Sequence, residues 1–89
     1  MDKSTDRIVA RFDYARLLKQ ATVPIITIYQ HPADYPDKYV ARVWDVNRPT
    51  NLAAVADTYE ELMEAIPTNQ MTKMTRSPAD DPVILETWI

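Results

Sequence analysis

The sequence predicts a small α+β domain with a mostly antiparallel sheet and two helices on one face, in the order α-β-β-β-α-β-β. The first observation behind this prediction is length, since 89 residues fit one domain. The second is that two segments carry helix-capping signals. The third is that short runs rich in β-branched and aromatic side chains fill the remaining chain. We expect residues 1–21 to hold the N-terminal helix of this single domain, and residues 23–89 to hold the sheet and one short helix.

The first predicted helix lies at the N-terminus, where Ser4 or Thr5 can cap it, and it should run to about Gln20. At about 100° per residue, its apolar side chains fall on two sides instead of one. A helix that is apolar on two sides is normally covered on two sides. Either the helix bends or is tucked under a loop, or a partner chain covers the second side. One side holds Ile8, Val9 and Phe12, and the other holds Tyr14, Leu17 and Leu18.

Three strands are predicted next. Residues 23–29 are rich in β-branched side chains and should form the first of them. Residues 39–46 should form the second, although neither of its faces is purely polar. Residues 47–51 have the composition of a turn, after which residues 52–56 return as a short partner strand in a hairpin.

A second helix is predicted to begin at Thr58, because Thr58 and Glu61 have capping-box spacing, in which each satisfies the other's free backbone N–H. Pro67 should end this helix. Residues 71–75 should form a weak strand, and residues 83–89 a final strand that is tied into the sheet, since a frayed end would expose several large apolar side chains. The apolar stripe of the second helix is Tyr59, Leu62 and Ile66.

The composition excludes several classes of protein. The chain has no cysteine, which removes disulfides, thiolate metal sites and thiol nucleophiles, and which suits a reducing cytoplasm. Its N-terminal segment is rich in charge, unlike a secretory signal peptide. Its longest apolar run, residues 52–56, is far shorter than the roughly 20 residues needed to span a bilayer. We therefore expect a cytoplasmic protein without a membrane segment.

Net charge and glycine content argue against two further classes of function, nucleic-acid binding and nucleotide binding. The net charge is −3, with +2 on residues 1–20 and −5 on residues 57–89, whereas nucleic-acid-binding domains are normally basic. The chain has no glycine, where an average usage of about 7% would give about six. Phosphate-binding loops of the Walker and dinucleotide-binding types need glycine, so no nucleotide cofactor is expected. Turns must depend on proline, asparagine and aspartate instead.

Few groups suited to catalysis or metal binding come together in the sequence. His31, with Asp34 and Asp37, matches no specific metal motif, and two proline-led turns explain the composition of this segment. A second acidic group surrounds the start of the last strand, but it lacks the lysine that would stabilise a phosphoryl transition state. We therefore predict no enzyme activity, no metal and no small-molecule cofactor. The second group is Asp80, Asp81 and Glu86, with Trp88 at the lysine position.

Aromatic and arginine side chains are the best candidates for binding. Tyrosine, tryptophan and arginine are the usual anchors of protein interfaces, and on an open sheet they can also stack single-stranded bases. A competing interpretation places Tyr39 and Trp44 in the core on opposite faces of their strand, with Arg42 along the edge of Trp44. Base stacking would need more positive charge, so nucleic acid is the less favoured partner. The predicted partner-binding residues are Tyr14, Leu17, Leu18, Arg42, Trp44 and Arg48, and the nucleic-acid alternative uses Tyr39, Arg42, Trp44 and Arg48.

Three segments, ITIYQHPADYPDKYVARVWD, ADTYEELMEAIP and RSPADDPVILETWI, resemble segments of small, uncharacterised proteins of Gram-positive bacteria and their mobile elements. This resemblance spans about residues 25–89 and implies a compact bacterial domain. The strand–turn–strand followed by ADTYEEL also resembles, more weakly, the HicB-type antitoxins, whose domains neutralise a partner toxin. Those proteins carry hairpin glycines and a separate DNA-binding segment, neither of which is found in this sequence.

The function predicted from the sequence is that of a non-enzymatic interaction or regulatory domain of a bacterium or mobile element, which acts through its surface. Self-association through the first helix is the specific form to test, because that helix is predicted to be apolar on two sides. A single-stranded nucleic-acid-binding or antitoxin-like module is the alternative.

Overall fold

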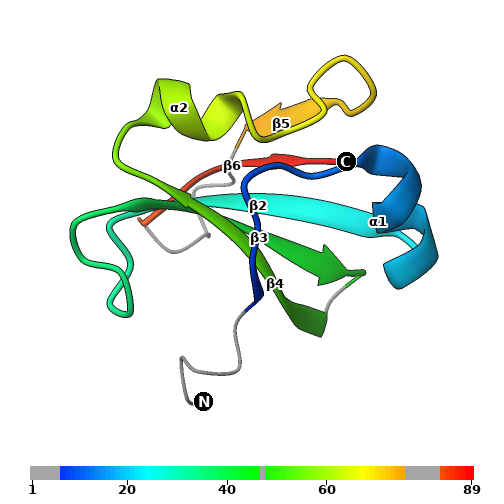
Figure 1. The fold of residues 1–89 in the computed structure, drawn as a ribbon, viewed down its shortest axis with the longest axis horizontal. Coiled ribbons are helices and arrows are strands. Elements are labelled where there is room, and N and C mark those ends of the chain that lie inside the picture. The colour runs from blue at the N-terminus through cyan, green and yellow to red at the C-terminus, as the bar shows by residue number, and fades with distance from the viewer. Residues whose placement is uncertain (1–6, 47, 76–82) are drawn as a thin grey trace.

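The computed structural model describes residues 7–46, 48–75 and 83–89, and it has the predicted α+β fold. Within these residues, six strands form one mixed sheet, and two short helices pack against it (Figure 1). The predicted element order is wrong by one strand, because the observed order is β-α-β-β-β-α-β-β. The elements are β1 (Arg7–Ile8), α1 (Tyr14–Gln20), β2 (Pro24–Gln30), β3 (Tyr39–Asp45), β4 (Arg48–Ala56), α2 (Tyr59–Met63), β5 (Lys73–Thr75) and β6 (Ile84–Trp88).

The sheet has the strand order β1-β4-β3-β2-β6-β5. In the described chain, the pairings among β2 to β6 are all antiparallel, and only β1 runs parallel to its neighbour, β4. The β2–β3 hairpin is paired without a bulge, from Pro24 opposite Asp45 to Gln30 opposite Tyr39. The sheet is therefore mostly antiparallel, as predicted, with this regular hairpin near its centre.

The first apolar residues of the described chain lie in a strand, where a helix was expected. Arg7 and Ile8 lie opposite Leu52 and Ala53 of β4, and the backbone N–H of Val9 donates a hydrogen bond to Ala53 O at 2.9 Å. Ile8 and Val9 are β-branched, and such side chains fit a pleated sheet better than a helix. Pairing with β4 therefore replaces the first half of the predicted helix.

Helix α1 begins only at Tyr14. Asp13 is its N-cap, and the Asp13 carboxylate accepts a hydrogen bond from the backbone N–H of Ala15 at 3.0 Å. The predicted caps, Ser4 and Thr5, lie outside the described residues. The two apolar sides expected on one long helix belong to two separate elements. This removes the sequence argument that a partner must cover the second side.

Helix α2 begins where the sequence predicts. The Thr58 hydroxyl accepts a hydrogen bond from the backbone N–H of Glu61 at 3.1 Å, which confirms the capping interaction at Thr58. The helix ends at Met63, earlier than the proline stop predicted at Pro67. After it, the backbone turns more tightly, and the N–H of Ile66 bonds the carbonyl three residues earlier.

The core lies between the helices and one face of the sheet. Leu17 of α1 and Leu62 of α2 are almost fully buried and belong to one apolar cluster with residues of β2, β3 and β4. Both helices therefore pack on the same face of the sheet, as predicted. The sheet residues of this cluster are Ile26, Ile28, Ala41, Val43, Leu52 and Ala54.

Two turns adopt positive φ without glycine. His31 follows β2 with φ of 50°, and its N–H bonds Lys38 O across the β2–β3 loop at 2.9 Å. Val46 follows β3 with φ of 58°, which is unusual for a β-branched residue. The left-handed conformation costs about 1–2 kcal/mol for a residue with a side chain. The next strand also begins earlier than predicted, because β4 starts at Arg48 instead of residue 52.

Candidate functional site

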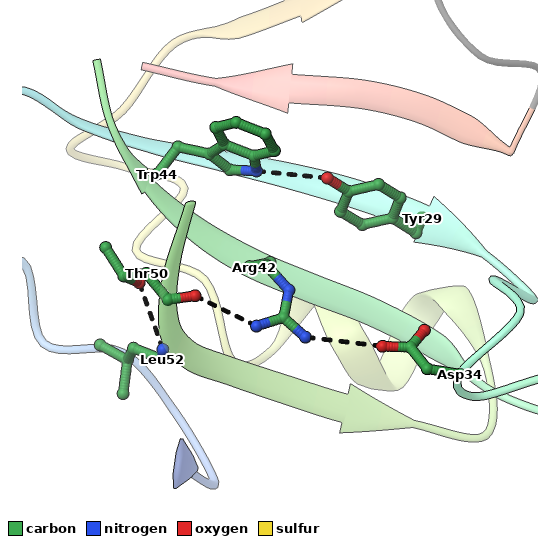
Figure 2. A network of polar contacts seen from close by, with 6 residues as sticks. All are labelled: Tyr29, Asp34, Arg42, Trp44, Thr50 and Leu52. Atoms are coloured by element: carbon green, nitrogen blue, oxygen red, sulfur yellow. Dashed lines mark hydrogen bonds and ion pairs between the residues drawn. The ribbon is translucent and has the colours of Figure 1, made fainter. Parts of the chain in front are cut away.

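The candidate site lies on the face of the sheet opposite the helices. Successive side chains of a strand point to opposite faces, so Arg42 and Trp44 lie on the other side of β3 from the core residues Ala41 and Val43. Tyr29 of β2 joins them on this face (Figure 2). Figure 2 views the sheet from this side, with α2 behind the strands. We call this surface the aromatic face and define it by Tyr29, Arg42 and Trp44.

Tyr29 and Trp44 form a ridge between two hollows. The Trp44 Nε1–H donates a hydrogen bond to the Tyr29 hydroxyl at 3.2 Å, which fixes the two rings relative to one another. Hollows of about 270 Å³ and about 260 Å³ lie on the two sides, and both side chains line both hollows. The first is also lined by Pro32, Asp34, Val40 and Arg42, and the second by Ile25, Thr27, Val46, Ile84 and Thr87.

An irregularity in β4 positions Arg42. The β3–β4 register shifts between Arg42 and Trp44, which leaves backbone groups without their usual ladder partners. The Thr50 hydroxyl replaces two of these hydrogen bonds, donating to Val43 O at 2.7 Å and accepting from Leu52 N at 3.2 Å. The carbonyl of Thr50 is then directed at Arg42 and accepts from Nη1 at 3.1 Å (Figure 2).

The charge of Arg42 is compensated within the chain. Its Nη2 lies 3.8 Å from the Asp34 carboxylate, which the β2–β3 loop brings over the face. The Arg42 side chain is 16% exposed. The guanidinium is thus held in one position, and the aromatic face carries little net charge.

Only two of the six predicted partner-binding residues, Arg42 and Trp44, lie on the aromatic face. Leu17 is 1% exposed and is a core residue, so it is not accessible to a partner in the folded chain. Tyr14 is half-buried against the core, and Leu18 is 51% exposed. Arg48 is exposed at the start of β4, opposite Asp45.

Tyr39 lies on the opposite side of the sheet from Trp44. It packs against the core cluster, and its ring meets His31 edge-on with centroids 5.1 Å apart. The placement of Tyr39 and Trp44 on opposite faces of β3 is therefore confirmed, whereas the placement of Trp44 in the core is not, because Trp44 lies outside the core cluster. Because of this separation, the four residues of the nucleic-acid alternative do not share one face.

The six predicted partner-binding residues do not include Tyr29 or Asp34, although Tyr29 is among the aromatic residues of the sequence that could serve in binding. The hairpin register places Tyr29 opposite Val40 and Thr27 opposite Arg42, which puts Tyr29 on the face of Arg42. The length of the β2–β3 loop, which fixes this register, is the only sequence signal that places Tyr29 on the face of Arg42. The position of Asp34 depends on the path of the loop, for which the sequence offers only turn-forming residues.

Glu86 does not form part of an open acidic group. It is 5% exposed and lies on the helix-covered side, where its carboxylate accepts from the Tyr59 hydroxyl at 2.8 and 2.9 Å and from the Trp88 Nε1–H at 2.6 Å. Lys73 Nζ lies 3.7 Å from the same carboxylate. The other members of the predicted acidic group, at positions 80 and 81, lie outside the described residues. The Glu86 carboxylate is therefore satisfied by structural partners.

The pKa of the Tyr59 hydroxyl is raised by its burial and by its contact with Glu86. Burial, followed by the hydrogen bond to Glu86, raises the pKa of the Tyr59 hydroxyl to about 12. We expect the difference in tyrosinate absorbance between the wild type and a Tyr59→Phe variant to be centred near that pH, and not near the usual value of about 10. Since the folded pKa lies above the unfolded one, the stabilisation is complete below about pH 10 and is lost as pH rises through about 12. A difference curve centred near pH 10 would contradict the contact.

His31 and its neighbouring aspartates form no metal site in the described residues, where no group of three or more potential ligands comes together. Within the same residues, no helix has the length and apolar character needed to cross a bilayer. Neither a scan against protein-family models nor searches of curated proteins and of solved structures found a match for this chain.

Proposed function

We propose that this chain is a non-enzymatic protein-interaction domain and that the aromatic face binds its protein partner. The observation that carries the proposal is the fixed Tyr29–Trp44 ridge with a hollow on each side. Rigid aromatic side chains bind with little loss of conformational entropy, and tyrosine, tryptophan and arginine supply most of the binding energy in many protein interfaces. The absence of cysteine suits action in a bacterial cytoplasm.

The chemistry of the face indicates the kind of partner surface. Among the described residues, Arg42 is the only cation that lines the two hollows, and Asp34 is the only anion. A partner that places apolar side chains in the two hollows would match this surface. A strongly charged partner would gain little from it.

Single-stranded nucleic acid is the second candidate, because the Tyr29–Trp44 ridge offers two aromatic rings on which bases can stack. The charge distribution argues against it. Nucleic-acid affinity depends on cations that replace the counterions of the phosphates, and the guanidinium of Arg42 is already paired with Asp34.

The test uses a variant of the ridge and a control variant at an exposed apolar residue outside it. Tyr29→Thr/Trp44→Thr removes the ridge and keeps β-forming side chains, whereas Leu18→Gln removes an exposed apolar side chain of α1. We expect wild type and Leu18→Gln to retain the same protein from the native host. The purified protein should bind both with similar affinity and bind the ridge variant at least tenfold more weakly.

Two results would contradict the proposal. One is equal binding of the retained protein by a ridge variant that keeps the far-ultraviolet spectrum of the wild type. The other is quenching of tryptophan fluorescence by single-stranded oligonucleotides at low salt, reversed at high salt, which would favour the nucleic-acid alternative.

A further inference from the structure

A second surface, distinct from the aromatic face, lies around the segment that joins β1 to α1. This segment, residues 9–12, is anchored at both ends: Val9 N donates to Ala53 O at 2.9 Å, and Phe12 N donates to Ala65 O at 2.7 Å. In Figure 1, the segment crosses the near side of the molecule, with α1 on its right and α2 to its upper left. A hollow lies on each side of it.

The hollow on the α1 side is positively charged. Arg7, Arg11 and Arg16, from three successive parts of the chain, line a space of about 210 Å³. In the described part of the chain, Asp13 is the only acidic residue of this lining, and its carboxylate caps α1. Among the described residues, no ion pair involves any of the three arginines. The described lining of this hollow thus has three guanidinium groups and one carboxylate, which gives it a net positive charge.

The wall of the basic hollow is partly apolar. Phe12, Leu17 and Leu52, all nearly buried, contribute to its lining. A carboxylate that enters beside these side chains loses part of its contact with bulk water, and its attraction to arginine is then less screened. Bidentate pairing with guanidinium groups is the geometry that arginine offers to such a carboxylate.

The hollow on the α2 side is mainly acidic. It measures about 490 Å³ and is lined by Asp57, Glu61 and Glu64. Lys38 also lines it, but this lysine pairs with Asp57. Arg11 is shared between the two hollows. Glu61 and Glu64 are exposed residues next to the three arginines. Oε1 of Glu61 accepts a hydrogen bond from the Thr58 hydroxyl at 3.1 Å, which leaves its second oxygen and the Glu64 carboxylate for a partner.

We infer that this surface joins two copies of the chain in a two-fold symmetric dimer. Rotation by 180° about an axis along residues 9–12 places the basic hollow of one copy over the acidic hollow of the other, and the reverse. A two-fold interface must be complementary to itself, and adjacent patches of opposite charge satisfy that requirement. Ala10, an exposed residue of this segment that lines the acidic hollow, lies next to the axis and supplies an uncharged centre.

The strength and salt dependence of this dimer follow from its charges. Each exposed ion pair contributes little by itself and is screened by salt. The dimer should therefore be weak, and raising NaCl from about 20 mM to about 300 mM should raise its Kd at least tenfold. The aromatic face takes no part, so a Tyr29→Thr/Trp44→Thr variant should dimerise like the wild type.

Charge reversal supplies the test. Arg7→Glu/Arg16→Glu makes the first hollow acidic, and Glu61→Lys/Glu64→Lys makes the second basic while the backbone N–H of residue 61 still bonds Thr58. Each variant alone should have a Kd at least tenfold higher than the wild type, because like charges then face each other. An equimolar mixture should regain a dimer, because both contacts of the mixed pair join opposite charges. Arg48→Glu, a reversal outside both hollows, should leave Kd within about twofold.

Sedimentation equilibrium of the full chain at about 20 mM NaCl, with circular dichroism to confirm folding, measures these outcomes. A wild type that stays monomeric at about 1 mM protein would overturn the inference. So would a dimer that persists in either reversal variant, or a mixture of the two folded variants that fails to associate.

Discussion

Replacement of Glu86 by alanine is expected to lower the free energy of unfolding by about 3 kcal/mol. The carboxylate is 5% exposed and accepts hydrogen bonds from Tyr59 and Trp88, with Lys73 nearby. Its removal leaves the hydroxyl of Tyr59 and the indole N–H of Trp88, both on half-buried side chains, without this acceptor, and each such loss costs about 1–3 kcal/mol. For a chain of 89 residues, this is a large part of the total stability.

Urea unfolding followed by tryptophan fluorescence measures this effect. Two further variants separate the contributions to this loss of stability. Tyr59→Phe removes one hydrogen-bond donor, and Glu86→Gln keeps an acceptor oxygen but removes the charge. Both should cost less than Glu86→Ala, about 1–2 kcal/mol each. Glu64→Ala, at an exposed position near the end of α2, is the control and should change stability by less than about 0.5 kcal/mol. Equal stability of Glu86→Ala and Glu64→Ala would show that the buried network is not formed.

Local signals in the sequence were sufficient for part of this fold. The capping interaction at Thr58 depends on residues three apart, and helix α2 begins where it predicts. The strand predicted at residues 39–46 agrees with β3 to within one residue, because the aromatic and β-branched side chains of this run continue to the turn at Val46. Features of this kind are determined by neighbours along the chain.

Features that depend on distant partners were not predictable in this way. The pairing of Arg7 and Ile8 with β4 joins segments far apart in the sequence, and the same residues at helical spacing also suit an amphipathic helix. Likewise, Glu86 has its main partner, Tyr59, 27 positions earlier in the chain. For Arg7 and Ile8, pairing with β4 decides between a strand and a helix. For Glu86, the hydrogen bond from Tyr59 decides between a structural contact and a place in an open acidic group. The sequence alone leaves both choices open.

The candidate binding surface also depends partly on neighbouring residues, which the sequence reveals, and partly on distant ones, which it does not. The sequence indicated that Arg42 and Trp44 are two residues apart in a strand and so share a face. It did not indicate which face the helices cover, because both faces of that strand carry apolar side chains. The ridge with Tyr29 then follows from the register of the hairpin, and the placement of Arg42 follows from the irregularity in β4 around Thr50.

Leu17 and Leu18 provide the sharpest contrast between the predicted helix and the observed one. The sequence pattern placed both on one partner-binding side. In the structure, Leu17 is 1% exposed within the core cluster, whereas Leu18 is 51% exposed. We expect Leu17→Ala to lower the free energy of unfolding by about 3 kcal/mol, because it removes buried apolar area and leaves a cavity. Leu18→Ala should change it by less than about 0.5 kcal/mol.

The matched pair separates packing from association because both substitutions make the same chemical change on the same helix. If Leu17 lay in a dimer interface, its effect on stability would depend on protein concentration, since dissociation would accompany unfolding. For a core residue, the urea midpoint of the variant should fall by the same amount at about 5 µM and at about 500 µM protein. Similar losses for Leu17→Ala and Leu18→Ala, or a loss for Leu17→Ala that varies with concentration, would restore the idea that this helix is covered by a second chain.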